Sequence, residues 1–170
     1  MSGTEQMKID WLFGMPGSGK TYIAKRISEM TGIPSYEGDD FHTEDDRKAI
    51  AESRFTLGRR HQQLQRIIAT LQTSGVSHAL VTHPLPDRKS RALVRSFGSA
   101  VRLIHVKAPL EVIKDRLSAR TNHHFDIGLL ATWIPRHWEE PEGEECLVIK
   151  NDLDNTLLDA ELRKVWPSVT

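Results

Sequence analysis

The sequence predicts an α/β fold of three layers, with a five-stranded parallel sheet that carries helices on both faces. Short apolar runs alternate with amphipathic stretches of helical spacing along the chain, which is typical of parallel strands joined by crossover helices. No internal repeat, low-complexity tract or Gly/Ser-rich linker divides the sequence. We therefore expect one domain over residues 1–170, a length that can bury a real core.

The predicted strands are apolar runs bounded by turn residues. The first is apolar almost throughout, the pattern of a strand covered on both faces. The third ends in His83-Pro84-Leu85-Pro86, which must be a loop because two prolines flank one residue. The strand candidates are residues 8–13, 35–37, 78–82, 100–106 and 146–149.

The predicted helices lie between these strands. Thr43 begins one of them, because it is a capping residue with Asp46 three places on. Pro109 suits the first turn of another helix, and we expect Pro135 to break a short helical piece. Residues 139–145 read as an acidic surface loop. The helix candidates run from the glycine-rich turn to about 30, over 43–53, 58–73 and 87–97, from 109 to an irregular stretch at 120–126, and over 129–134 and 157–165.

Composition excludes several classes of protein. Lys plus Arg and Asp plus Glu each number 23, so the net charge is zero, which argues against a broad surface for nucleic acid or an anionic membrane. No apolar run approaches the roughly 18 residues that span a bilayer. The polar N-terminus lacks the apolar core of a signal peptide, and Cys146 is the single cysteine. We expect a cytoplasmic protein without disulfides.

The segment Gly14-Met15-Pro16-Gly17-Ser18-Gly19-Lys20-Thr21 has the spacing G-x-x-x-x-G-K-T between a strand and a helix. Its glycines let backbone N–H groups turn toward phosphate oxygens at a helix N-terminus. The lysine can reach the β- and γ-phosphates, and the threonine hydroxyl can ligate Mg²⁺. The sequence therefore predicts ATP and Mg²⁺ as ligands. The expected binding residues are Gly14, Gly17, Ser18, Gly19, Lys20 and Thr21.

Asp39 and Asp40 follow the second strand. In an open parallel sheet the ligand crevice lies beyond the carboxyl ends of the strands, so these carboxylates should face the glycine-rich loop. Phosphoryl transfer to a hydroxyl needs a group that takes its proton, and a carboxylate can do this or help to hold Mg²⁺. Either aspartate could be the base; the alternative is an Asp pair that caps the turn before Thr43.

Basic residues form a second set of candidates. Arg116 and Arg120 are four apart and could fold over the nucleotide from a lid at about residues 116–138, neutralising charge on the transferring group. The alternative for Arg116 is a solvated face with nearby acids. Arg60 and Arg88 follow the second and third strands and could clamp an anionic acceptor, although basic helix starts are usually only solvated.

The eight histidines do not show the spacing of a zinc site. His42, His83 and His123 stand on loops expected at the active edge, where they could bond a polyhydroxyl substrate. No Asp ends the third strand, where many phosphate-loop ATPases hold Mg²⁺ through an acid. This absence suits small-molecule kinases, in which the acid can come from the second strand.

Two stretches beyond the glycine-rich loop resemble the gluconate kinase family. Gly38-Asp39-Asp40-Phe41-His42 is similar to the G-D-x-L-H that ends the second strand of the family. The family's R-x-x-H-F-x-x-x-x-L-L-x-S-Q aligns with this chain from Arg120 without a gap, through His123 and Leu129-Leu130. Its L-E-E-P is similar to residues 138–141, with one residue inserted. The resemblance covers about residues 8–165.

The resemblance implies a phosphate-loop kinase fold that uses Mg-ATP to phosphorylate a sugar-acid hydroxyl. By position, it implies that Asp39 contacts the acceptor or Mg²⁺, that Arg120 is a lid arginine, and that His42 and His123 line the site. It also implies a homodimer. The acceptor side departs from the family. The family's P-L-x-D-x-D-R-x-P-W-L is replaced here by a stretch in which arginines stand in place of the acids. Of its charged residues, Arg60 alone keeps an equivalent in the family motif.

We therefore expect an ATP-dependent kinase acting on a small, anionic sugar-acid-like or hydroxy-acid metabolite. Gluconate phosphorylation proper is the second interpretation. The third, from another class, is a nucleotide-binding module that has lost catalysis and binds a partner. A polynucleotide kinase is a weaker fourth, since it would need a basic groove with stacking aromatic residues.

Overall fold

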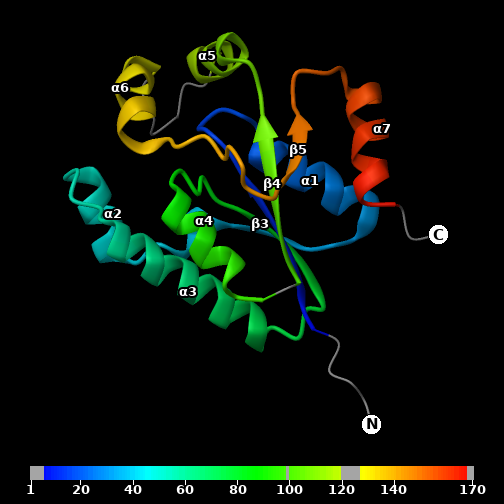
Figure 1. The fold of residues 1–170 in the computed structure, drawn as a ribbon, viewed down its shortest axis with the longest axis horizontal. Coiled ribbons are helices and arrows are strands. Elements are labelled where there is room, and N and C mark those ends of the chain that lie inside the picture. Colours follow the sequence, from blue (N-terminus) through cyan, green and yellow to red (C-terminus); the bar gives the residue numbers. More distant parts are fainter. Residues whose placement is uncertain (1–5, 99, 120–126, 168–170) are drawn as a thin grey trace.

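The structure, a computed structural model, describes residues 6–98, 100–119 and 127–167. The described residues form a sheet of five parallel strands in the order β2-β3-β1-β4-β5, with helices on both faces (Figure 1). The predicted fold class is thus confirmed. The strands are β1 (Lys8–Phe13), β2 (Ser35–Glu37), β3 (His78–Thr82), β4 (Val101–Lys107) and β5 (Leu147–Lys150).

The helices match the predicted set, with one addition, a short 3-10 turn after β2. Figure 1 shows α5 and α6 beyond the carboxyl ends of the strands, the edge at which the glycine-rich loop follows β1. The helical elements are α1 (Lys20–Thr31), η1 (Gly38–Phe41), α2 (Glu44–Ala51), α3 (Leu57–Thr73), α4 (Arg88–Arg95), α5 (Leu110–Ala119), α6 (Ile127–His137) and α7 (Asn155–Val165).

The central strand β1 divides the core into two layers because its side chains alternate between the faces. Trp11 and Phe13 are fully buried against α3 and α4. Leu12 is fully buried on the other face, where α1 and α7 pack against the sheet with Ile104 and Leu162. Burial on both faces explains why β1 is almost continuously apolar.

Helix boundaries follow from capping side chains. The Thr43 hydroxyl accepts the Asp46 N–H and the Asp46 carboxylate accepts the Thr43 N–H, which completes the predicted capping box. Asp154 caps α7 by accepting two backbone N–H groups, so this helix begins two residues before the predicted Leu157.

The predicted break at Pro135 is wrong, because α6 continues through it to His137. Proline removes one backbone donor, and the next turn still closes, since the Trp138 N–H donates to Ile134 O at 3.0 Å. No helix within the described ranges is both long and apolar enough to cross a membrane.

Candidate active site

The loop between β1 and α1 is bridged by its own lysine. Lys20 Nζ donates to the carbonyl oxygens of Gly14 and Met15, each at 3.0 Å. Gly14 has no room for a side chain, because a Cβ there would lie 2.4 Å from Val106 O. Gly19 adopts φ of +93° at the helix start, a conformation that favours glycine. The loop therefore keeps its backbone N–H groups and lysine around a space that suits phosphate.

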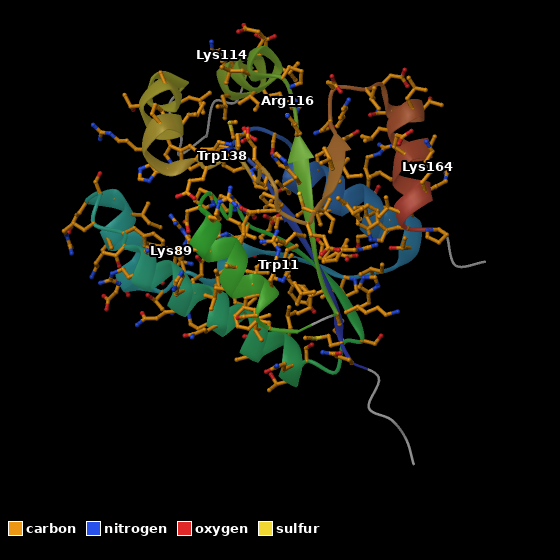
Figure 2. All side chains as sticks on the ribbon, viewed as in Figure 1. Trp11, Lys89, Lys114, Arg116, Trp138 and Lys164 are labelled. Atoms are coloured by element: carbon orange, nitrogen blue, oxygen red, sulfur yellow. The ribbon has the colours of Figure 1, made fainter. Side chains whose placement is uncertain are left out.

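The far side of this loop is supported from α5 and from the residue after β5. Arg116 donates to Ser18 O at 3.1 Å and to Asn151 O at 2.6 Å. Asn151 is 4% exposed, donates to the same Ser18 oxygen at 2.8 Å, and occupies the space that a Cβ on Gly19 would need. Arg116 thus lies at the predicted nucleotide loop (Figure 2), whereas no sequence pattern indicated Asn151.

Glu37 lies against the threonine that is predicted to ligate Mg²⁺. Thr21 Oγ1 donates to Glu37 Oε2 at 3.1 Å, and Thr82 Oγ1 donates to the same oxygen at 2.6 Å. Glu37 ends β2 and pairs in register with Thr82 at the end of β3. The carboxylate missing from the third strand is therefore supplied by the second. The sequence analysis missed it, although the last residue of a strand on this edge was a signal for it.

Asp39 lies in η1, one turn from the loop, with a side chain that is 82% exposed. Its carboxylate is 4.0 Å from His42 Nδ1. The turn is positioned by Gly38, which is buried and closely packed: a Cβ there would lie 2.6 Å from Thr82 O. Asp40 is also exposed. The exposed carboxylate of Asp39 thus lies two residues after Glu37, which contacts Thr21 at the end of the phosphate loop.

His83 is linked to the η1 turn through Gln63. Its Nδ1 accepts the Leu85 N–H at 3.0 Å, so the proton is on Nε2, which donates to Gln63 Oε1 at 3.0 Å. Gln63 Nε2 in turn donates to Gly38 O at 2.7 Å. Burial, and then nearby positive charge, holds the pKa of His83 well below its usual range, so the ring is neutral. Both ring nitrogens of this predicted substrate ligand are thus engaged within the protein.

Most arginines of α3 are already paired with acids. Asp46, with 3% of its side chain exposed, binds Arg59 at 3.2 Å and Arg66 at 2.6 Å. Arg66 also donates to Phe41 O. Burial raises the pKa of Asp46, but hydrogen bonds from Thr43 and Arg59 outweigh this and lower it. This cluster fixes α2 against α3 beside the acceptor side of the site.

Arg60, unlike Arg59 and Arg66, does not bind Asp46. Its Nη1 donates to Asp87 Oδ2 at 2.6 Å, and its guanidinium lies 5.9 Å from the Phe55 ring centroid. His42 packs edge-on against the same ring at 5.4 Å. His137 on α6 feels the charge of Arg60, which after burial lowers the pKa of that histidine. Arg60 and His42 therefore contact the same Phe55 ring, and His42 also lies 4.0 Å from Asp39.

The remaining predicted residues divide into two groups. Arg88 is engaged by the acidic loop, since it donates to Glu142 O at 3.0 Å and its backbone N–H donates to Glu139 Oε2. Arg120 and His123 lie outside the described residues. The acidic loop is not wholly a surface feature as predicted, because the Glu144 side chain is only 6% exposed.

The chain is similar in sequence and fold to several kinases. It is 25% identical over 153 residues to a "Probable gluconokinase" of Schizosaccharomyces pombe, covering 85% of this chain and 79% of that protein. It is 32% identical over 112 residues to a "Probable adenylyl-sulfate kinase" of Aeropyrum pernix, covering 62% and 61%. An unliganded sugar kinase from Janibacter sp. HTCC2649 superposes with a TM-score of 0.76 at 25% identity, over 94% of both chains.

A phosphate loop after the central strand β1, a carboxylate at the end of β2 that contacts the loop threonine, and kinases as relatives together define an ATP-dependent small-molecule kinase of the P-loop class. A family model described as AAA domain matches residues 10–131, and the chain belongs to this family. The similarity to the gluconate kinase family that the sequence predicted is confirmed.

Proposed function

We propose that this kinase transfers the γ-phosphoryl group of ATP to a hydroxyl of a small metabolite that carries one carboxylate, of the sugar-acid or hydroxy-acid type. The proposal rests on two residues that we place in one region beside the phosphate loop. Asp39 has an exposed carboxylate, which suits a hydroxyl, and Arg60 uses only part of its guanidinium on Asp87, so the rest suits an anion.

On the nucleotide side, Lys20 and the loop N–H groups bind the phosphates, and Arg116 supports the loop from α5. The Thr21 hydroxyl and the Glu37 carboxylate, 3.1 Å apart, are hard oxygen donors that suit Mg²⁺. Asp39 could also contribute, directly or through water. Bound there, Mg²⁺ would neutralise charge on the phosphates.

On the acceptor side, Asp39 orients the hydroxyl and takes its proton as the phosphoryl group transfers. Burial lowers the pKa of His42, although the charge of Asp39 opposes this, so a neutral ring can hydrogen-bond a second hydroxyl. Arg120 and His123 remain predicted partners by their positions in the sequence.

The charge of the acceptor is inferred from α3. Arg59 and Arg66 are neutralised by Asp46, so they do not support a highly charged acceptor. Arg60 uses Nη1 on Asp87, and its other donors have no partner in the described part of the chain. A planar guanidinium with free donors suits a carboxylate. This supports a single carboxylate, and the names of the relatives make gluconate the first acceptor to test.

The acceptor is found by following ADP release over sugar acids, neutral sugars and hydroxy acids. We expect Lys20→Met to remove nearly all turnover. Asp39→Asn should lower kcat by about 10²- to 10⁴-fold, the usual contribution of a general base, with unchanged ATP affinity. Asp40→Asn is the matched control and should change kcat little. Equal losses in the two Asn variants would refute the role of Asp39.

Arg60 is tested by discrimination between gluconate and glucitol, two open-chain polyols that differ only in the carboxylate at C1. Arg60→Met should lower the gluconate-to-glucitol ratio of kcat/KM by about tenfold or more, as expected for a charge-assisted contact. Arg59→Met, with its side chain on Asp46, should leave the ratio unchanged. Tight ATP binding without transfer to any acceptor would instead favour the non-catalytic binding module.

A further inference from the structure

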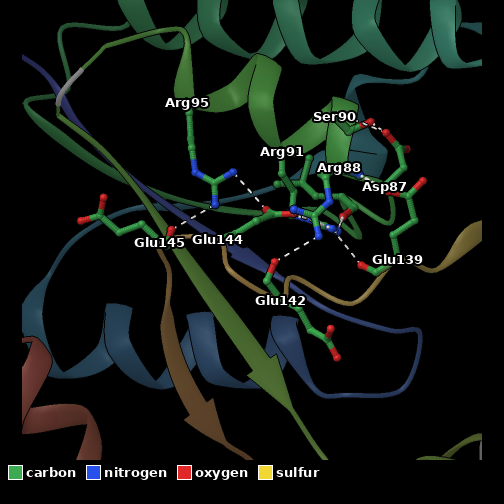
Figure 3. Close-up of polar contacts among 10 residues, drawn as sticks. Asp87, Arg88, Ser90, Arg91, Arg95, Glu139, Glu142, Glu144 and Glu145 are labelled. Carbon is green, nitrogen blue, oxygen red and sulfur yellow. Dashed lines mark hydrogen bonds and ion pairs between the residues drawn. The ribbon is translucent and has the colours of Figure 1, made fainter.

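Arg91 is a fully buried arginine that touches neither the phosphate loop nor the proposed acceptor region. Its Nε and Nη2 donate to the two carboxylate oxygens of Glu144 at 2.9 and 3.1 Å. Its Nη1 donates to Leu85 O at 2.8 Å, and Nη2 also donates to Glu139 O at 2.8 Å. Every side of the guanidinium is therefore engaged (Figure 3).

The same guanidinium lies against two aromatic rings from different parts of the site. It is 5.6 Å from the ring centroid of Phe13 and 6.0 Å from that of Trp138. Phe13 immediately precedes Gly14 of the phosphate loop, and Trp138 immediately follows α6. His105 completes the stack, 4.9 Å from Phe13 and 5.7 Å from Trp138. Arg91 thus connects the strand that carries the loop with the end of α6.

Two neighbouring arginines of α4 also bind the acidic segment, residues 139–145. Arg95 binds Glu144 at 3.0 Å and donates to Glu145 O, while Arg88 donates to Glu142 O (Figure 3). We name Arg88, Arg91 and Arg95 the α4 clamp. The clamp holds residues 139–145, which begin directly after α6 and Trp138. The position of the α6 end therefore depends on α4.

Burial of a complete ion pair is a weak source of stability, because the cost of removing both charges from water offsets their attraction. Such pairs are better explained by the geometry they impose. Here the geometry concerns α6, because its Ile134 and Met15 of the phosphate loop pack against the same apolar clusters. The end of α6 therefore lies beside the phosphate loop.

We infer that Arg91 is a positioning residue for phosphoryl transfer. By holding Phe13, Trp138 and Glu144 together, it sets the distance between the phosphate loop and the end of α6. The inference rests on the proposed function, because the acceptor must bind close to that loop. A misplacement of about 1 Å between reacting groups can lower a rate about 10²-fold.

The test compares Arg91→Met, Arg91→Lys and Glu144→Gln with Arg102→Met, which removes an arginine bound to a buried aspartate on the opposite face of the sheet. Steady-state ADP release with gluconate as acceptor gives kcat and KM, calorimetry gives the Kd for MgATP, and urea unfolding shows that each variant is folded. We expect Arg91→Met to lower kcat/KM for gluconate by about tenfold or more while the MgATP Kd stays within about twofold.

Arg91→Lys keeps the charge but loses the fork of donors, so its kcat/KM should lie between wild type and Arg91→Met. The losses in Arg91→Met and Glu144→Gln should not add in the double variant, since both break one unit. Arg102→Met should leave the kcat/KM of the folded protein unchanged. Equal turnover in Arg91→Met and Arg102→Met, or a loss explained wholly by MgATP binding, would overturn the inference.

Amide hydrogen exchange separates this inference from the proposed acceptor class. If the wild-type chain does not phosphorylate gluconate, the proposed acceptor fails and exchange without substrate decides the role of the clamp. Faster exchange across α6 in Arg91→Met than in Arg102→Met supports the inference. Equal exchange in the two variants contradicts it.

Discussion

Asp10 and Glu144 are buried carboxylates with similar partners on opposite faces of the sheet. Asp10, near the start of β1, accepts two hydrogen bonds from Arg102 at 2.7 and 2.8 Å, one from Trp166 at 2.7 Å, and contacts His78 at 2.9 Å. Glu144 accepts from Arg91 and Arg95 next to Trp138. Both carboxylates are almost without solvent exposure, at 3% and 6%.

The two clusters differ in what they join. Asp10 ties together β1, β4, the start of β3 and the residue after α7, all parts of the frame. Glu144 ties one helix to the segment that leads from α6, whose end lies beside the phosphate loop, into β5. The same chemistry should therefore act on stability in the Asp10 cluster and on turnover in the Glu144 cluster, because the elements that each cluster joins decide what it constrains.

The largest effect should come from Asp10→Asn. Removing one charge from a buried pair leaves the other uncompensated, so we expect a loss of about 3 kcal/mol in the free energy of unfolding. Urea denaturation at pH 7 measures it. The folded variant should keep the wild-type kcat/KM, because Asp10 lies away from the loop. A loss of turnover comparable to that of Glu144→Gln would erase the distinction between the clusters.

The pH dependence of this loss follows from the pKa of Asp10. Burial raises the pKa, but hydrogen bonds from Arg102, Trp166 and His78 outweigh burial and lower it. A carboxylate with a lowered folded-state pKa stabilises the fold above its unfolded pKa of about 3.9, and the contribution disappears as pH falls through the folded value. The difference between wild type and Asp10→Asn should therefore shrink below about pH 4.

A second effect, at higher pH, should come from His105→Phe, which sharpens the comparison. Burial lowers the pKa of His105 to about 4, so the folded ring is neutral where the unfolded one, with a pKa of about 6.5, takes up a proton. Its contribution is complete above pH 6.5 and is lost as pH falls toward 4. Phenylalanine keeps the stack on Phe13 and Trp138.

We expect the variant to reduce the slope of unfolding free energy against pH in this window by about 1.4 kcal/mol per pH unit, one proton. His83, also buried and neutral, still contributes to the remaining slope. Urea midpoints at half-unit pH steps measure the change. An unchanged slope would show that His105 takes up its proton equally in both states.

The smallest effect should come from Arg88→Ala. Its side chain is 54% exposed, and exposed ion pairs contribute about 0–1 kcal/mol. We expect the unfolding free energy to fall by less than about 1 kcal/mol and the KM for the acceptor to change little. A large rise in that KM would restore Arg88 as the substrate ligand that the sequence predicted, and would move the acceptor toward α4.

The fold could be predicted from local chemistry. Alternating apolar runs identified the strands, and the capping box of Thr43 and Asp46 identified the start of α2. Pro135 misled because one missing donor is not sufficient to end a helix whose other hydrogen bonds persist. Errors at helix ends came from caps such as Asp154, whose role depends on the backbone around it.

The candidate site could be predicted only in part. The glycine-rich loop is a local signal, so Lys20 and Thr21 were found. Glu37 was missed because its contact with Thr21 joins the end of β2 to the first turn of α1, 16 residues apart. The role of Arg91 was also missed, since burial against Glu144, 53 residues away, leaves no local mark. In both cases the role of the residue depends on a partner that is distant in the sequence, and residue type alone does not reveal that partner.

The contact between Asn151 and the phosphate loop has a consequence for synthesis of the chain. Asn151 bonds to Ser18 across 133 residues, and its amide packs against Gly19. A nascent chain has the complete loop sequence early, but this support is translated 133 residues after Ser18. Tight ATP binding should therefore arise only after Asn151 has left the ribosome, and stalled chains that end before Asn151 should bind ATP more weakly than chains that extend past α7.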